Sequence, residues 1–307
     1  MQVSNNRSTR YLSAALLLTM SPLAIALACD LQITRIEEAS RSSALKYDVF
    51  NRDGLIKRFD LYIQRTDDGD APCSAAVRVL PQGLTRLINA GNSQLQYRLQ
   101  PLETDGVYRN GELRLQAKSI AKGQQLKFSY QVLFTAEQFV ASGMYQDKLW
   151  LEVSDPSQVD KPFLERRDTV LTASVAPAAR ISFAGTQGRS QLVDFGELTD
   201  GKQISPAPQI VIQSTGSFAM TFSSLNRGAL RHQSGKEKWD IPYQSALAGR
   251  TLPLTEYTTT LRYTQPTSAL GLRLPLLLSV PKVGQKPAGT YKDVIRVVIS
   301  PSDLLIN

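Results

Sequence analysis

Apolar and polar residues alternate along most of the chain after residue 28. Apolar side chains recur at every second position in residues 57–65 (KRFDLYIQR), in residues 126–134 and in residues 272–280. Alternation with a period of two is typical of β-strands that bury one face. Clusters of Gly, Asn, Asp and Pro separate these segments and mark turns. The pattern predicts an all-β chain of short strands, as in β-sandwiches and barrels.

One strand pattern occurs twice at a constant spacing. Residues 142–154 (SGMYQDKLWLEVS) match residues 288–300 (AGTYKDVIRVVIS) at an offset of 146, and at the same offset Tyr97 falls on Tyr243. The matched positions are Gly143, Tyr145, Asp147, Leu149, Leu151 and Val153 in the first copy, and Gly289, Tyr291, Asp293, Ile295, Val297 and Ile299 in the second. One offset shared by separate segments indicates two tandem copies of one β-domain. The expected domains are residues 29–177 and residues 178–307.

The second copy of this strand lacks a successor that the first copy has. The first copy continues into residues 169–177 (TVLTASVAP), which can fold back beside the strand before them. In the second copy Ile295, Val297 and Ile299 are expected to face the core, but no comparable segment follows them. An open apolar edge is an aggregation hazard unless a strand of another chain fills it. The pattern therefore predicts a C-terminal sandwich that lacks its last strand and offers these three residues to a donor strand.

Residues 1–28 have the features of an export signal. Two arginines precede an interrupted apolar run, and Ala26 and Ala28 form an A-x-A cleavage site. Cleavage after Ala28 would leave Cys29 at the mature N-terminus. Acylation of Cys29, as in a lipoprotein, stays open as an alternative.

Cys29 and Cys73 are the two cysteines of the chain. Exported proteins meet an oxidising compartment, where two cysteines usually pair, so we expect a disulfide between them. Such a bridge closes a loop of about 45 residues and contributes roughly 4 kcal/mol. Two cysteines and the single His232 do not complete a zinc site, so no metal is expected.

The net charge of the chain and the distribution of its basic residues indicate little about its function. The formal net charge is +8, and the basic residues are scattered. Their densest group, residues 231–238 (RHQSGKEK), is expected to form a solvated loop that includes His232, so nucleic acid is not an expected partner. Anionic glycans or surfaces remain possible partners. Glu152 and Arg296 hold outward positions on the two matched strands, where their charges can stay in water.

Sequence signals for an enzyme are weak. Residues 119–122 (SIAK) match S-x-x-K, but the companion motifs of that enzyme class are missing. The acids of residues 66–72 (TDDGDAP) lack the spacing of a calcium loop and are expected to form a turn. Trp150 and Trp239 are expected to be packing residues. We therefore predict no enzymatic activity, no catalytic residue and no cofactor.

The second copy resembles a known family. Residues 193–203 (VDFGELTDGKQ), residues 241–247 (IPYQSAL) and residues 288–300 are similar to the spore coat protein U domain, the subunit type of archaic chaperone–usher pili. The resemblance implies an incomplete immunoglobulin-like fold, so the fold class expected for the whole chain is two tandem immunoglobulin-like β-sandwiches. It also implies three partners: a periplasmic chaperone, an outer-membrane usher, and an adjacent pilin subunit that donates a strand. The second copy departs from the family in lacking its cysteine pair.

The resemblance also implies a position in the pilus. Subunits of such pili carry a donor strand ahead of their first cysteine, whereas the predicted cleavage leaves Cys29 first. We therefore expect a tip adhesin that is exported through the periplasm, mediates attachment to host or abiotic surfaces, and supports biofilm formation. The alternatives are a non-adhesive secreted envelope or coat protein and a minor shaft pilin. A secreted hydrolase would need a polar cleft, which the sequence does not indicate.

A surface-binding loop is expected at the far end of the first domain. The linker that precedes residues 169–177 contains four apolar residues, namely Val159, Pro162, Phe163 and Leu164. Exposed apolar side chains at this position could bind hydrophobic surfaces. In the alternative interpretation, Phe163 and Leu164 tuck against the sandwich as a lid.

Overall fold

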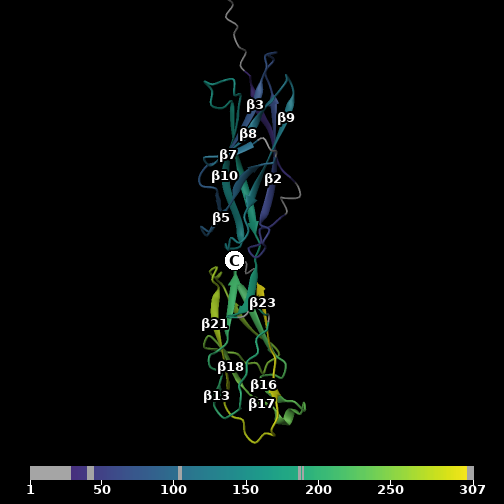
Figure 1. Ribbon diagram of the computed structural model, residues 1–307, viewed down its shortest axis with the longest axis vertical. Coiled ribbons are helices and arrows are strands. Elements are labelled where there is room, and N and C mark those ends of the chain that lie inside the picture. The colour runs from purple at the N-terminus through teal and green to yellow at the C-terminus, as the bar shows by residue number, and fades with distance from the viewer. Residues whose placement is uncertain (1–28, 40–44, 103–105, 186–187, 189, 303–307) are drawn as a thin grey trace, which may run out of the picture.

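The computed structural model describes residues 29–39, 45–102, 106–185, 188 and 190–302 (Figure 1). The predicted export signal at residues 1–28 lies outside the described residues. Two stacks of strands follow each other end to end along the molecule (Figure 1). In the described part of the chain, no helix is long and apolar enough to cross a membrane.

Residues 29–175 form the first unit, a sandwich of two sheets. One sheet has the order β1 (Leu31–Glu38), β2 (Leu55–Arg65), β9 (Gln125–Phe134) and β6 (Arg98–Pro101). The other has the order β5 (Gln94–Gln96), β4 (Arg86–Ile88), β10 (Gly143–Ser154), β3 (Ser74–Pro81), β8 (Glu112–Ser119) and β7 (Gly106–Arg109), and β11 (Glu165–Val175) also pairs with β10. Alternate side chains of both sheets meet in one buried core.

Residues 179–302 form the second unit, which is built in the same way. Its first sheet has the order β12 (Ala179–Phe183), β14 (Gln209–Ser214), β21 (Leu272–Val280), β18 (Gln244–Leu247) and β19 (Arg250–Thr251), with β13 (Lys202–Gln203) on β21. A second sheet has the order β20 (Thr259–Tyr263), β15 (Phe218–Ser224) and β23 (Ile295–Pro301). A third has the order β17 (Ile241–Pro242), β16 (Ala229–His232) and β22 (Tyr291–Lys292), next to a 3₁₀ turn at Glu237–Trp239. The predicted fold class, an all-β chain of two tandem immunoglobulin-like β-sandwiches, is confirmed.

Strand register confirms the predicted repeat. β6 pairs with β9 through Arg98 and Leu133, and β18 pairs with β21 through Gln244 and Ser279, which lie 146 residues further along in both strands. The matched tyrosines keep the same contacts as well. The Tyr145 hydroxyl donates to a backbone carbonyl four residues before it at 2.6 Å, and the equivalent hydroxyl in the second unit does so at 2.7 Å.

The two units are joined by a short, hydrogen-bonded junction. Three residues separate β11 from β12. The Ser142 N–H of the first unit donates to the Thr215 carbonyl of the second at 2.8 Å. The Arg180 guanidinium lies 4.7 Å from the centre of the Phe50 ring, a favourable cation–π distance. These contacts tie the units together beyond the covalent link.

Two predictions about polar side chains are wrong. Glu152 is only 2% exposed, because Arg78 from β3 and Arg166 from β11 form ion pairs with its carboxylate and cover it. His232 is 7% exposed and lies in β16, where its ring packs edge-on against Trp239 and Tyr291. Neighbouring strands and rings therefore remove both side chains from water.

Candidate functional site

The matched strands β10 and β23 differ in their neighbours. β10 lies between β3 and β11. It forms eleven residue pairs with β11, from Gly143–Val175 to Val153–Glu165. Its inward side chains are fully buried: Leu149 is 1% exposed, and Leu151 and Val153 are 0% exposed. β11 therefore seals the edge of the first sandwich with a segment of the same chain.

In the part of the chain that the structure describes, β23 forms a hydrogen-bonded ladder along only one of its two edges. It pairs with β15 from Ile295 to Pro301, and its other edge faces β12 without a ladder between them. Ile295, Val297 and Ile299 point toward the core as predicted, but all three stay half-buried. The other edge of β23 therefore has no partner strand among the described residues.

β12 contributes the opposite edge of this opening. Its inward residues Ala179, Ile181 and Phe183 are also half-buried and pack against the same core. In the first unit the equivalent strand β1 is covered: Ile33 is 0% exposed, and its N–H donates to the Glu165 side chain of β11. We call the half-buried residues of the second unit the apolar strip; they are Ala179, Ile181, Phe183, Ile295, Val297 and Ile299.

Sequence reasoning missed half of the apolar strip. It identified the three residues of β23 but not those of β12. Residues 179–183 (ARISF) alternate between apolar and polar positions, so they could be recognised as a strand. Their position opposite β23 depends on how the two sheets stack, which no local pattern contains.

The predicted surface-binding loop lies between β10 and β11, at the end of the first unit remote from the junction. Val159 is 90% exposed and Pro162 is exposed, whereas Phe163 and Leu164 are half-buried. The Arg166 guanidinium lies 4.5 Å from the Phe163 ring centre, and Leu164 packs on the core. The structure therefore divides the four residues into an exposed pair and a packed pair.

A disulfide and an ion pair hold the same end of the first unit. Cys29 and Cys73 are joined, with their Cα atoms 5.8 Å apart. Nearby, the guanidinium of buried Arg65 binds both oxygens of Asp67 at 2.8 and 2.9 Å. Hydrogen bonds from Arg65 keep the pKa of Asp67 well below its usual range. Asp67 also accepts a hydrogen bond from the Gly69 N–H at 2.9 Å, so this one acid of residues 66–72 holds the local conformation of the segment.

Comparisons with solved structures find adhesive and structural pilus subunits. The chain is similar to CfaE, the adhesive subunit of the CFA/I fimbria of enterotoxigenic Escherichia coli, with 13% identity and a TM-score of 0.40 over 89% of this chain and 83% of that one. It is similar to a complex of the chaperone CsuC and the tip adhesion subunit CsuE from archaic chaperone–usher pili of Acinetobacter baumannii, with 16% identity and a TM-score of 0.37 over 77% and 88%. It is also similar to self-complemented MyfA, the major subunit of Myf fimbriae from Yersinia enterocolitica, with 15% identity and a TM-score of 0.31 over 46% and 98%. No protein-family model matches the chain, and no curated protein sequence matches it.

Proposed function

We propose that this protein is an adhesin subunit at the tip of a chaperone–usher pilus, and that its second unit is completed by a strand from the next subunit. The difference between β10 and β23 carries the proposal. Leu149, Leu151 and Val153 are buried under β11, whereas their three counterparts in β23 stay half-buried beside an unpaired edge. Insertion of an alternating apolar strand would bury the apolar strip and satisfy that edge.

The first unit supports a direction for the incoming strand. β11 runs antiparallel to β10, from Glu165 opposite Val153 to Val175 opposite Gly143. By the repeat, an equivalent strand would start opposite Ile299, near the junction, and end opposite Gly289. Its own subunit would then continue beyond the end of the second unit that is remote from the junction. The first unit would point away from that subunit, as a tip requires.

The unpaired edge of β23 also suggests the partners of the protein. An exposed apolar strip would promote aggregation during export unless another protein covered it. The proposed partners are therefore a periplasmic chaperone, an outer-membrane usher and an adjacent subunit. The proposed location is the pilus tip at the cell surface. The archaic type of pilus and a role in biofilm rest on the resemblance of residues 193–203, 241–247 and 288–300 to the spore coat protein U domain.

The exposed pair of the loop, Val159 and Pro162, is the proposed contact with a host or abiotic surface. Both lie at the end of the first unit remote from the proposed pilus shaft. The packed pair, Phe163 and Leu164, would support the loop from below.

A self-completed chain tests the proposal. A second copy of residues 155–175 is appended after Asn307, with its copies of Glu165, Arg167 and Thr169 changed to Val, because these positions would lie opposite Ile299, Val297 and Ile295. Burial of three aliphatic side chains stabilises the second unit by about 3 kcal/mol. We expect a rise of about 10 °C in its Tm, measured by calorimetry.

The matched control carries Asp at the same three copied positions, which places charge opposite the apolar strip. We expect no rise in the Tm of this variant, together with continued co-purification of a periplasmic chaperone. Two results together would contradict strand acceptance: the chain alone is a stable monomer, and its Tm is the same with the Val extension and the Asp extension. They would favour a free-standing envelope protein.

A further inference from the structure

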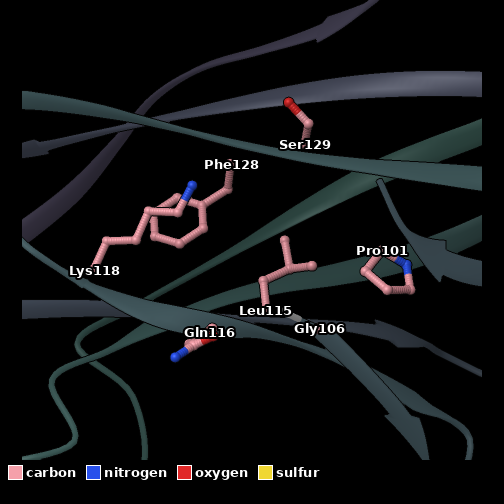
Figure 2. A pocket seen from close by; sticks show the side chains of 7 residues that line it. All are labelled: Pro101, Gly106, Leu115, Gln116, Lys118, Phe128 and Ser129. Carbon is pink, nitrogen blue, oxygen red and sulfur yellow. The ribbon is translucent and has the colours of Figure 1, made fainter. Parts of the chain in front are cut away.

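A recess between β8 and β9 of the first unit is too small to hold a ligand. It measures about 20 Å³, room for little more than one water molecule. Figure 2 shows its lining: Pro101, Gly106, Leu115, Gln116, Lys118, Phe128 and Ser129. A larger ligand could not enter this recess and would have to bind on an outer face of the sandwich.

The outer face of the sheet that contains β10 carries a row of paired charges. Strand register places four of them directly opposite one another on β11, β10, β3 and β8, namely Arg166, Glu152, Arg78 and Arg114. Glu112 lies two residues before Arg114 on β8 and therefore on the same face. Glu152 forms ion pairs with Arg166 and Arg78. Glu112 forms ion pairs with Arg78 and Arg114. We call these five residues the arginine ladder.

The arginine ladder exposes its cations and buries its anions. The side chains of Glu152 and Glu112 are 3% and 11% exposed. The side chains of Arg78, Arg166 and Arg114 are 32%, 38% and 62% exposed. Three positive and two negative charges leave the ladder with an excess of one positive charge. A ligand that approaches this face therefore meets guanidinium groups before carboxylates.

The arginines of the ladder keep hydrogen-bond donors for a ligand. A guanidinium has five N–H donors in one plane. Arg166 directs its Nε and Nη2 donors to Glu152, and Arg78 directs its Nε and Nη2 donors to Glu112. Within the described residues, Nη1 of Arg166 makes no hydrogen bond. This nitrogen can donate to an anion without breaking the ion pair with Glu152.

Two further cations extend the same face. Arg109 on β7 lies opposite Glu112, and Lys148 lies four residues before Glu152 on β10. Both side chains are exposed, and neither forms an ion pair in the part of the chain that is described. Asp168 on β11 is an exposed acid of this face, opposite Trp150. The exposed cations therefore outnumber the exposed acids around the ladder.

We propose that this face of the first unit binds an acidic polysaccharide through the arginine ladder, Arg109 and Lys148. Arg166 and Arg114 lie three strand spacings apart, about 14 Å, so one small anion cannot contact both. An extended chain with carboxylate or sulfate groups at intervals can follow the row, because guanidinium groups bind such oxygens strongly. The choice of a polysaccharide rests on the proposed location at the cell surface, whereas the ladder does not depend on strand acceptance.

Binding of a heparin octasaccharide to the full chain tests the proposal, with dextran as the uncharged control polymer. We expect calorimetry at physiological ionic strength to give a Kd of about 10 μM for heparin and no heat for dextran. Salt at about 1 M should weaken heparin binding by about tenfold, because it screens exposed charges.

Three substitutions remove cations from this face without leaving a buried carboxylate unpaired. Arg109→Gln, Arg114→Gln and Lys148→Gln together should weaken heparin binding by about tenfold. Glu112 keeps its ion pair with Arg78 in this variant. Asp168→Asn removes the exposed acid and should strengthen heparin binding by about twofold.

The matched control is Arg35→Gln with Arg98→Gln and Lys127→Gln, which removes the same charge from exposed positions on the other sheet of the first unit. It should leave heparin binding unchanged, and circular dichroism spectra should show that all variants keep the fold. The proposal is overturned if heparin does not bind, if dextran binds equally well, or if the control weakens binding as much as the first triple variant.

Anionic phosphatidylglycerol vesicles separate the two sources of negative charge at a cell surface. Vesicles that bind more tightly than heparin would overturn the polysaccharide and assign this face to a membrane surface. Either negative result would leave strand acceptance untouched, because strand acceptance is measured by the Tm of the self-completed chain.

Discussion

At the residue scale, the clearest shared feature of the two units is a tyrosine that donates to an aspartate; this tyrosine is buried in the first unit and half-buried in the second. The Tyr97 hydroxyl lies 2.6 Å from Asp147 Oδ2, and the Tyr243 hydroxyl lies 2.5 Å from Asp293 Oδ2. Asp293 also accepts from the Ser224 hydroxyl at 2.6 Å, so it ties the start of β23 to the end of β15. Burial raises the pKa of both phenols above the ordinary value, and the hydrogen bond to the aspartate raises it further.

These shifts predict a loss of stability in alkaline solution. An unfolded tyrosine ionises near pH 10, whereas Tyr97 and Tyr243 stay protonated in the folded chain. Above about pH 10 the folded state therefore binds more protons than the unfolded state, and the free energy of unfolding falls as pH rises. Tyr97→Phe and Tyr243→Phe should each cost about 1 kcal/mol at pH 7. Both should also flatten the alkaline decline in urea unfolding measured from pH 8 to 11. An unchanged slope would show that these phenols do not control the decline.

At the element scale, β10 and β23 share one sequence pattern but differ in the strands that lie beside them. β10 is an interior strand between β3 and β11, and β23 lies at a sheet edge in the described part of the chain. The inward side chains of a strand become fully buried only when strands on both sides, and the facing sheet, exclude water. Ile295, Val297 and Ile299 are therefore half-buried because β23 has a paired strand on one side only in the described residues.

Matched substitutions in these strands should separate stability from assembly. Leu151→Asp places a charge in a closed core and should cost the first unit about 4 kcal/mol or more. Val297→Asp changes the equivalent residue beside an open edge, where the carboxylate can reach water, and should cost the second unit only about 1 kcal/mol. Urea unfolding measures both costs. Val297→Asp should nevertheless abolish incorporation into pili, measured by immunoblot of sheared surface material; normal incorporation would contradict a role for this edge.

At the scale of the whole molecule, the open edge and the exposed loop lie on different units. The apolar strip belongs to the second unit, whereas Val159 and Pro162 lie at the end of the first unit remote from the junction. Direct contacts across the junction, such as the Ser142–Thr215 hydrogen bond, connect the two. This arrangement suits a protein that is anchored through one end and makes contact through the other.

The exposed pair and the packed pair of the loop should respond differently to substitution. Val159→Ser with Pro162→Ser removes exposed apolar surface and should abolish attachment of piliated cells to polystyrene without changing the Tm. Phe163→Ser with Leu164→Ser removes packed side chains and should cost the first unit about 2 kcal/mol. If the cells still attach after the first double substitution, Val159 and Pro162 are not the contact with the surface.

Much of the fold could be predicted from the sequence, because strand alternation and turn residues act locally. The 146-residue repeat requires only matched residues, and it aligns Tyr97 with Tyr243 and Asp147 with Asp293, but the hydrogen bond within each pair appears only in the structure. The burial of Glu152 could not be predicted, since it depends on Arg78 and Arg166 from two neighbouring strands. The role of β12 in the apolar strip depends in the same way on sheet stacking.

The sequence by itself determined the β class, the repeat and the inward face of β23, because a period of two assigns each side chain to one face of a strand. Only the tertiary structure decided which faces are covered. It placed β12 opposite β23 and packed Leu164 and the ring of Phe163 against the first unit. Coverage depends on contacts between strands that are far apart along the chain, and such contacts leave no signature in the local alternation of residues.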